Sequence, residues 1–180
     1  MLDLTAADGY DELFPYVLIV MALICGECML HGPFVTGRSR KRTFTQEFMS
    51  QFEIDHAKAI DNTKIINGGY PDSGSGVYSQ QLTYKQWFDF NNAIRVHMNY
   101  VEQLPLFMTI IFLAGIKLPL PTLILSGLYF VTRFLYTLGY VCAGPNLRQI
   151  GAAPNNLIKY GLFGMSFYTV ACFLDHYRYA

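Results

Sequence analysis

The sequence predicts an all-α membrane protein, an up-down bundle of four transmembrane helices. Apolar residues make up 52% of the 180-residue chain and charged residues only 14%, well below the share of about a quarter that soluble proteins carry. The apolar residues fall into four blocks. With its flanks, each block approaches the ~20 residues that a membrane helix needs. Four such blocks favour a single membrane domain, spanning residues 1–180, over a soluble core.

The four apolar blocks define the predicted helices in chain order. The second and third blocks are joined around Leu118 and Pro119, and so short a connection predicts a tight antiparallel hairpin. The third connection runs from Gly144 to Asn156. Aromatic residues, 16% of the chain, gather near several block ends, as in interfacial belts. The blocks are Leu13 to Leu30, Tyr100 to Ile116, Leu118 to Val141 and Leu157 to Leu174.

A polar insert from residue 36 to residue 89 separates the first two blocks. Thr43 and Gln46 form a predicted capping box at its beginning. Phenylalanines then recur at four-residue spacing, which predicts a short amphipathic helix lying on the membrane or against a partner. They are Phe44, Phe48 and Phe52. Residues 67–76 are rich in glycine and serine and are expected to form a loop.

The distribution of charge predicts how the chain is oriented. Most cations lie in the insert, and the third connection adds Arg148. The opposite side is mainly acidic, with Lys117 and Arg178 as its cations. By the positive-inside rule, the insert and the third connection face the cytoplasm or its equivalent, and both termini face away. The formal net charge of zero implies no general attraction to nucleic acid.

The first block contains the C-x-x-C sequence Cys25-Gly26-Glu27-Cys28. It has no βαβ pattern around it and no second cysteine pair for zinc, so we interpret the cysteines as small packing residues. Glu27 lies inside an apolar helix and therefore needs a partner. An arginine of a neighbouring helix or subunit is the hypothesis.

Three polar residues stand at the mouth of the uncharged run from Leu104 to Ile116. Arg95, Asn99 and Glu102 are separated by four and then three residues, which places them on one helix face. Ionisable groups are costly near the membrane interior, so their presence indicates a functional site. The alternative to a functional site is that Arg95 and Glu102 pair with each other and have only a structural role. His97 projects from another face and is expected to make a helix–helix contact.

A second polar set follows the third block. Arg133, Tyr136 and Tyr140 also share one helix face, and Arg148 comes after them. Because the helices alternate, we expect this set, the Arg95 set and the cations from Arg38 to Arg42 at one membrane face. Arginine binds carboxylates, a carboxylate binds ammonium, and a cation stabilises a thiolate. Glutathione has two carboxylates, one amine and one thiol, and so it offers a group for each of these interactions. For the cations from Arg38 to Arg42, we favour a role in setting membrane topology over a role in binding.

These two sets of residues resemble the MAPEG family, membrane-associated proteins of eicosanoid and glutathione metabolism. The first match is Arg95-x-His97-x-Asn99-x-x-Glu102-x-x-Pro105. The second runs from Tyr129 to Tyr140 and continues with Gly144-Pro145 and Arg148. This second match is most similar to the type 3 microsomal glutathione transferase branch. The insert is longer than in that branch.

The resemblance implies a homotrimer of four-helix subunits that binds glutathione between neighbouring subunits. Arg148 is the nearest match to the arginine that activates the thiol, and Tyr140 is assigned to catalysis with it. The residues implied in glutathione binding are Arg38, Arg95, Asn99, Glu102, Tyr136 and Tyr140; Arg40 is the alternative to Arg38.

The sequence therefore supports a glutathione-dependent transferase or peroxidase acting on lipophilic electrophiles or lipid hydroperoxides. Its expected partners are membrane lipid, a small lipophilic substrate and two further copies of itself. The alternative is a non-catalytic accessory subunit of a larger membrane complex, for example a mitochondrial energy-converting assembly. A lipid-binding scaffold is a third hypothesis. The family default for localisation is the endoplasmic reticulum, and a mitochondrial membrane is the alternative.

Overall fold

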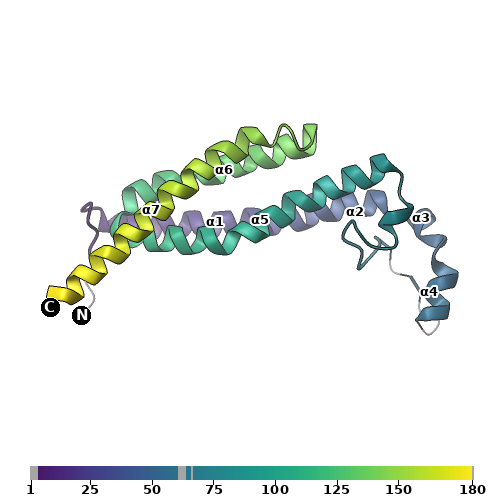
Figure 1. Cartoon of the computed structure of the whole chain (residues 1–180), viewed down its shortest axis with the longest axis horizontal. Coiled ribbons are helices and arrows are strands. Elements are labelled where there is room, and N and C mark those ends of the chain that lie inside the picture. The colour runs from purple at the N-terminus through teal and green to yellow at the C-terminus, as the bar shows by residue number, and fades with distance from the viewer. Residues whose placement is uncertain (1–3, 61–63, 66, 180) are drawn as a thin grey trace. The chain divides into compact units, whose positions relative to one another are not determined.

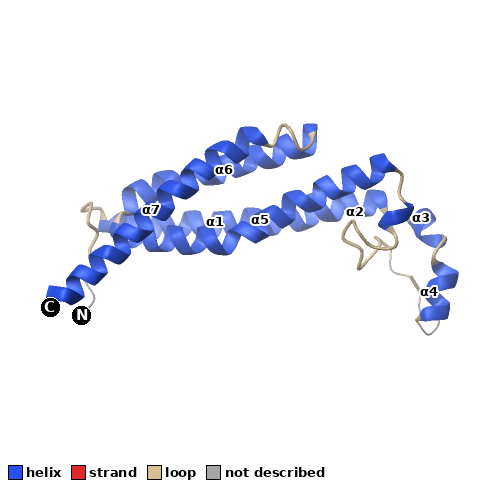
Figure 2. Cartoon of the chain, in the orientation of Figure 1, coloured by secondary structure: helices blue, strands red, loops and turns tan. Residues whose placement is uncertain are grey.

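The computed structural model describes residues 4–60, 64–65 and 67–179. Helices and loops make up this described chain, and it contains no strand (Figure 2). It forms two compact units, Met1–Cys28 with Tyr100–Ala180 as the first and Met29–Asn99 as the second. The α-helices are α1 (Phe14–His31), α2 (Arg38–Thr43), α3 (Gln46–Ser50), α4 (Glu53–Ala59), α5 (Tyr84–Lys117), α6 (Pro119–Ala143) and α7 (Gln149–Tyr179), as labelled in Figure 1.

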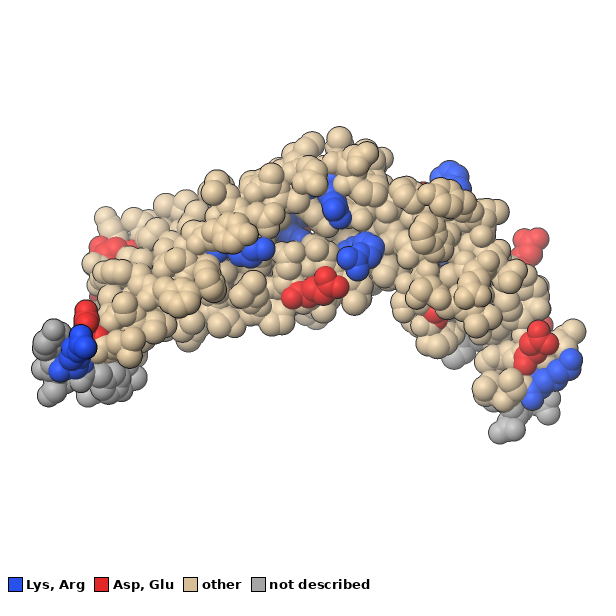
Figure 3. Space-filling view, in the orientation of Figure 1, with Lys and Arg blue, Asp and Glu red and all other residues tan. Residues whose placement is uncertain are grey.

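Four helical stretches are long and apolar enough to cross a membrane, which confirms the predicted fold class. Many large apolar side chains on them are exposed, including Phe167 at 61% and Leu157 at 76%. Charged side chains are sparse on the face drawn in Figure 3. Such a surface suits lipid contact, because water would penalise so much exposed apolar area. The stretches are Asp11–Thr43, Tyr84–Lys117, Pro119–Ala143 and Gln149–His176.

The helices extend beyond the predicted apolar blocks. Helix α5 begins at Tyr84, far before the predicted Tyr100. Its first turn is stabilised by a capping box: the Thr83 amide donates to Gln86 Oε1 at 3.0 Å, and the Gln86 amide lies 3.4 Å from Thr83 Oγ1. Helix α7 begins at Gln149, so the third connection is shorter than predicted. The apolar blocks locate the membrane spans, whereas the polar beginning of α5 is held by capping.

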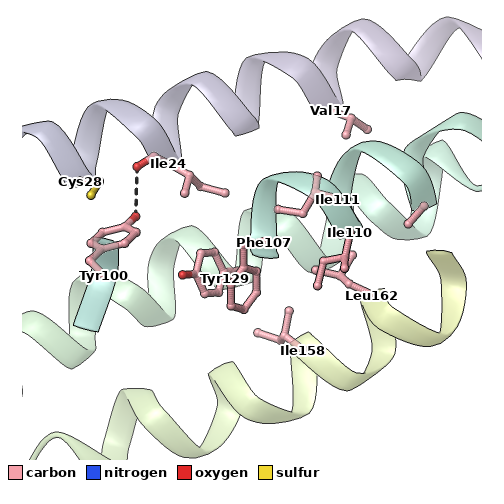
Figure 4. Close-up of a cluster of buried hydrophobic side chains, with 11 residues drawn as sticks. Val17, Ile24, Cys28, Tyr100, Phe107, Ile110, Ile111, Tyr129, Ile158 and Leu162 are labelled. Atoms are coloured by element: carbon pink, nitrogen blue, oxygen red, sulfur yellow. Dashed lines mark hydrogen bonds between the residues drawn. The ribbon is translucent and has the colours of Figure 1, made fainter. Parts of the chain in front are cut away.

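All four long helices contribute side chains to the core of the first unit (Figure 4). The rings of Phe107 in α5 and Tyr129 in α6 stack with centroids 3.8 Å apart. Tyr100 and Phe107 are seven residues apart on α5, as are Val17 and Ile24 on α1, so each pair lies on one face of its helix. Burial of these faces against one another holds the first unit together.

The connection between α5 and α6 is a single residue, Leu118, which confirms the predicted tight hairpin. The N-terminal segment packs across it. The amide of Ala7 donates to the Lys117 carbonyl at 2.7 Å, and Lys117 Nζ donates to the Thr5 carbonyl at 2.8 Å. The Leu120 amide donates to an Asp8 carboxylate oxygen at 3.1 Å. These bonds bring the beginnings of α1 and α6 to the end of α5.

Helices α6 and α7 approach so closely that glycine is required between them. A Cβ atom on Gly151 would lie 2.5 Å from both the Thr132 carbonyl oxygen and the Tyr136 amide nitrogen. A Cβ on Gly139 would lie 2.7 Å from the Leu147 carbonyl oxygen. Because the obstructing atoms are backbone, they cannot rotate away. Gly151 therefore sets the separation of α6 and α7, and Gly139 sets the close approach of the loop at Leu147 to α6.

The second unit has its own aromatic core, which corrects the prediction for the insert. Phe44 is buried against Phe90 of α5, with ring centroids 4.9 Å apart. The phenylalanine series therefore packs within this unit. The predicted single helix is divided into α3 and α4, and the N-cap is Thr45, not Thr43. The Thr45 hydroxyl accepts from the Phe48 amide at 3.2 Å.

Two charged groups organise the loop of the second unit. Arg40 is buried and donates to the carbonyl oxygens of Gly68 and Gly69 at 3.0 and 3.3 Å. The Asp72 carboxylate accepts from the Ser79 hydroxyl and amide, both at 2.7 Å, and from the amides of Gly74 and Gly76. Burial opposes ionisation of Asp72, but these hydrogen bonds outweigh it and lower the pKa of the carboxyl group.

Candidate functional site

The most deeply buried charged side chain in the described chain is Arg133 of α6, which is 1% exposed. Its guanidinium carbon lies 4.3 Å from the centroid of the Tyr100 ring and 4.5 Å from that of Tyr136. The cation is therefore held between the faces of two aromatic rings. Such cation–π contacts are stronger in desolvated surroundings than in water.

The partner of Glu27 is supplied from two other helices of the first unit. The Tyr100 hydroxyl donates to Glu27 Oε2 at 2.8 Å and lies 3.2 Å from the Ile24 carbonyl oxygen (Figure 4). The carboxylate also interacts electrostatically with Arg133. The hypothesis that an arginine of a neighbouring helix compensates Glu27 is thus supported. Tyr100, which the sequence marked only as the beginning of the second apolar block, is the intermediary.

The predicted face of α6 continues from Arg133 to the end of the helix. Tyr136 and Tyr140 are 4% and 5% exposed, and their ring centroids are 5.7 Å apart. The guanidinium carbon of Arg148, in the loop after α6, lies 5.7 Å from the centroid of the Tyr140 ring. Two tyrosines therefore lie between two arginines along one line, with the fully buried Arg133 at one end and the half-buried Arg148 at the other. This confirms that the three α6 residues share a face.

The remaining predicted residues divide between the two units. Arg38, Arg95 and Asn99 belong to the second unit, whereas Glu102 belongs to the first with the α6 residues. Arg95 and Glu102 are exposed and Asn99 is half-buried. Each of these three α5 residues takes part in at least one interaction. The choice between a binding role and structural pairing for them stays a prediction.

Arg40, predicted as the alternative to Arg38, has a structural role. Besides its hydrogen bonds to the loop, its guanidinium carbon lies 4.3 Å from the Tyr70 ring centroid and 5.2 Å from that of Phe90. It is 6% exposed. Arg38 is exposed. Of the two arginines, only Arg38 has a side chain accessible from solvent.

The cysteine pair of α1 lies within the packing of the first unit. Cys28 belongs to the buried core, and the thiol of Cys25 donates to Met108 Sδ at 3.6 Å. Both are free thiols. Their contacts are those of small packing residues. Within the described residues, no group of three or more His, Cys, Asp or Glu side chains is placed to hold a metal ion.

Tyr129 is a central residue of this region, although the sequence indicated it only as the first residue of the second family match. It is completely buried, stacks on Phe107, and interacts electrostatically with Glu27 and Arg133. Its position four residues before Arg133 was the available signal, since it continues the same helix face.

Within its described residues, the chain has four helices that are long and apolar enough to span a membrane, and the third of them, α6, carries a buried face of cations and phenols. This defines it as a polytopic α-helical membrane protein. The sequence model of the MAPEG family matches residues 17–168, which include all four long helices in whole or in part. The chain belongs to the MAPEG family. A separate comparison of the chain with curated proteins gave no match.

Proposed function

We propose that the protein is a glutathione-dependent transferase or peroxidase acting on lipophilic electrophiles or lipid hydroperoxides within the membrane. Membership of the MAPEG family supports a role in glutathione or eicosanoid metabolism. The observation that carries the proposal is the line from Arg133 to Arg148, in which two phenols, Tyr136 and Tyr140, lie between two cations. The closer relationship to the type 3 branch is part of this proposal.

In the proposed reaction, Arg148 and Tyr140 act on the glutathione sulfur. A guanidinium group and a phenolic hydroxyl near a thiol stabilise its thiolate, the nucleophilic form. In transfer, the sulfur forms a bond to the electrophilic carbon, and the leaving group departs with the electron pair of the broken bond. In peroxide reduction, two glutathione molecules supply two electrons and two protons. The products are an alcohol, water and glutathione disulfide.

The other charges of the site match the rest of the tripeptide. Arginines bind carboxylates in a bidentate geometry, which suits Arg38 and Arg95. Glu102 suits the ammonium group, and the Asn99 amide suits a peptide group. Tyr136 and Tyr140 supply phenolic hydroxyls. We assign these residues to glutathione binding in a homotrimer, in which neighbouring subunits complete each site.

The test uses the full chain purified in a non-ionic detergent. Glutathione binding by calorimetry and conjugation of 1-chloro-2,4-dinitrobenzene are measured, together with reduction of a lipid hydroperoxide. We expect saturable binding, competition by S-methylglutathione, and one or both activities. S-methylglutathione retains every recognition group but has no thiol, so it separates binding from chemistry. Absence of both binding and activity in a folded trimer would refute the proposal.

The second unit favours one further candidate, an accessory subunit of a larger membrane complex. It has its own buried core and a loop fixed by Asp72 and Arg40, neither of which is among the residues assigned to glutathione. A folded unit of this kind offers a surface for protein partners. Native electrophoresis of the tagged protein from its own membranes decides between the two. A homotrimer alone opposes the accessory role; stable co-migration with other subunits, without glutathione binding, supports it.

We place the protein in the endoplasmic reticulum by family default, with a mitochondrial membrane as the alternative. Fractionation of membranes followed by detection of the tagged chain distinguishes them.

A further inference from the structure

The second unit contains a pocket that is separate from the residues proposed for glutathione. Its volume is about 570 Å³, within the range of ~300–1,000 Å³ in which small-molecule sites fall. One wall is the beginning of α4 with Phe52, Asp55 and His56, and the other is the loop that carries Val77 and Tyr78. Both walls belong to Met29–Asn99.

The loop wall is fixed before any ligand arrives. Four hydrogen bonds to the Asp72 carboxylate hold residues 74–79 in place. A Cβ atom on Gly76 would lie 2.7 Å from that carboxylate, so glycine is needed for this close approach. The indole of Trp87 also donates to the Gly74 carbonyl at 3.1 Å. A preformed wall favours binding, because little conformational entropy remains to be lost.

Aromatic side chains meet at the junction of the two walls. The rings of Phe52 and Tyr78 form an edge-to-face pair with centroids 4.8 Å apart. Both side chains are half-buried and line the pocket. Pro71 and Val77 extend the apolar lining. The pocket therefore accommodates a ligand with an apolar body, and its aromatic faces attract a cation.

The charge of the pocket selects the sign of that ligand. Two carboxylates line it, Asp55 and Asp72, together with one basic side chain, His56, and no lysine or arginine is among its described lining residues. The Asp72 oxygens are engaged by the loop, whereas Asp55 is exposed at the opening. Lys58 lies on the same helix but does not line the pocket. Acidic side chains therefore outnumber basic ones in the described lining, which favours a cationic ligand.

We propose that this pocket binds an organic ammonium ion with an apolar body. The cation lies against the Phe52 and Tyr78 rings and pairs with Asp55, and the apolar body contacts Pro71 and Val77. Glutathione and its conjugates are anionic and are disfavoured by the same charge. The site is therefore independent of the proposed transferase activity. The ammonium group has two sources, a free amine or the headgroup of a choline lipid.

The experiment uses the full chain in a maltoside detergent, which carries no ammonium group. Choline and benzyltrimethylammonium are titrated by calorimetry, and 3,3-dimethylbutan-1-ol serves as the uncharged counterpart of choline. We expect both cations to bind, benzyltrimethylammonium more tightly, and the alcohol to bind at least about tenfold more weakly than choline. Equal binding of choline and the alcohol, or no binding of either cation at millimolar concentration, would overturn the proposal.

Two matched variants locate the site. Asp55→Asn removes the charge and keeps the side-chain volume, and Glu53→Gln does the same to an exposed acid of α4 outside the pocket. We expect Asp55→Asn to weaken cation binding by about tenfold and Glu53→Gln to leave it unchanged. Equal effects of the two variants would show nonspecific attraction and refute the assignment. Thermal unfolding and circular dichroism establish that both variants are folded.

The source of the ammonium group is resolved in nanodiscs. Choline binding is compared in bilayers of phosphatidylcholine and of phosphatidylglycerol. If binding is lost only in phosphatidylcholine, a lipid headgroup occupies the pocket. Equal binding in the two bilayers identifies a free amine as the ligand. Loss in both bilayers would show that the membrane covers the pocket and would overturn the proposal.

Discussion

The guanidinium carbon of Arg133 lies 4.3 Å from the centre of the Tyr100 ring, and the Tyr100 hydroxyl binds Glu27 at 2.8 Å. One tyrosine thus contacts both charges of a buried pair, the cation through its ring and the carboxylate through its hydroxyl. Three helices, α1, α5 and α6, are joined at this point. Removing any of the three groups leaves a charged side chain less well compensated, which is costly in a buried setting.

Replacing Tyr100 by Phe tests this arrangement. The ring and its contact with Arg133 are retained, while the hydrogen bond to Glu27 is lost. We expect the free energy of unfolding to fall by about 1–3 kcal/mol, seen as a lower midpoint of thermal unfolding in detergent. Tyr16→Phe is the control, because Tyr16 is 54% exposed on α1. If the two variants unfold at the same temperature, the hydroxyl does not stabilise the bundle.

The close approach of α6 and α7 provides a steric prediction. In Gly151→Ala, the added methyl group meets backbone atoms of Thr132 and Tyr136 at 2.5 Å, so the helices must separate. We expect the free energy of unfolding to fall by about 1–3 kcal/mol or more, as in overpacked cores. Activity should be lost as well if the α6 face is catalytic.

Gly164 on the same helix is the matched control, because a Cβ there would meet no atom within 4 Å. Gly164→Ala gains helix propensity worth up to about 1 kcal/mol. Opposite effects of the two substitutions are therefore expected from thermal unfolding. Destabilisation by both would indicate that the effect of Gly151→Ala does not arise from its contact with α6.

The sequence was sufficient to predict the four spans and the α6 face, because both follow from periodicity along one helix. Arg133, Tyr136 and Tyr140 lie at three- and four-residue spacing, and any helix must place them together. The connection between Glu27 and Tyr100 was not predictable in the same way. These residues are 73 positions apart, and their contact depends on how α1 packs against α5.

The errors in the insert have local causes. Both Thr43 and Thr45 precede suitable residues for capping, and the structure uses Thr45 because Phe44 turns into the core. The early beginning of α5 had a sequence signal in Thr83 and Gln86, which form a capping box ahead of a polar helical stretch. Hydropathy alone does not identify that stretch as helix, because it is polar. The hydrogen bonds of Asp72 depend on loop geometry, for which the composition offers no pattern.

Asp72 makes the second unit sensitive to acid. Its pKa is lowered in the folded protein, so its contribution to stability is fully present above the unfolded value of ~3.9. This contribution is lost as the pH falls below that value and through the lower folded pKa. We expect limited proteolysis within residues 67–81 to accelerate as the pH decreases from about 5 to 2, with an acid-active protease.

Asp72→Asn removes the ionisable group while keeping a similar shape. The variant should be cleaved faster than the wild-type protein at neutral pH, because an amide is a weaker acceptor for the four donors. Its cleavage rate should also depend less on pH over the acidic range. An unchanged pH dependence in Asp72→Asn would assign the acid sensitivity to other carboxylates.

Arg148 provides the sharpest test of the proposed chemistry, because its role is electrostatic. Loss of the guanidinium group in Arg148→Ala raises the pKa of the bound glutathione thiol, so less thiolate is present at neutral pH. We expect kcat to fall on the order of 10²-fold at neutral pH. The deficit should shrink as the pH rises toward the free-thiol value of ~8.5, where the thiolate forms unaided.

Arg148→Lys retains the charge and should preserve more activity, while glutathione binding measured by calorimetry changes little in either variant. A pH–rate profile that is lowered by the same factor at every pH would instead assign Arg148 a structural role, since a displaced Tyr140 would impair the reaction regardless of how much thiolate is present.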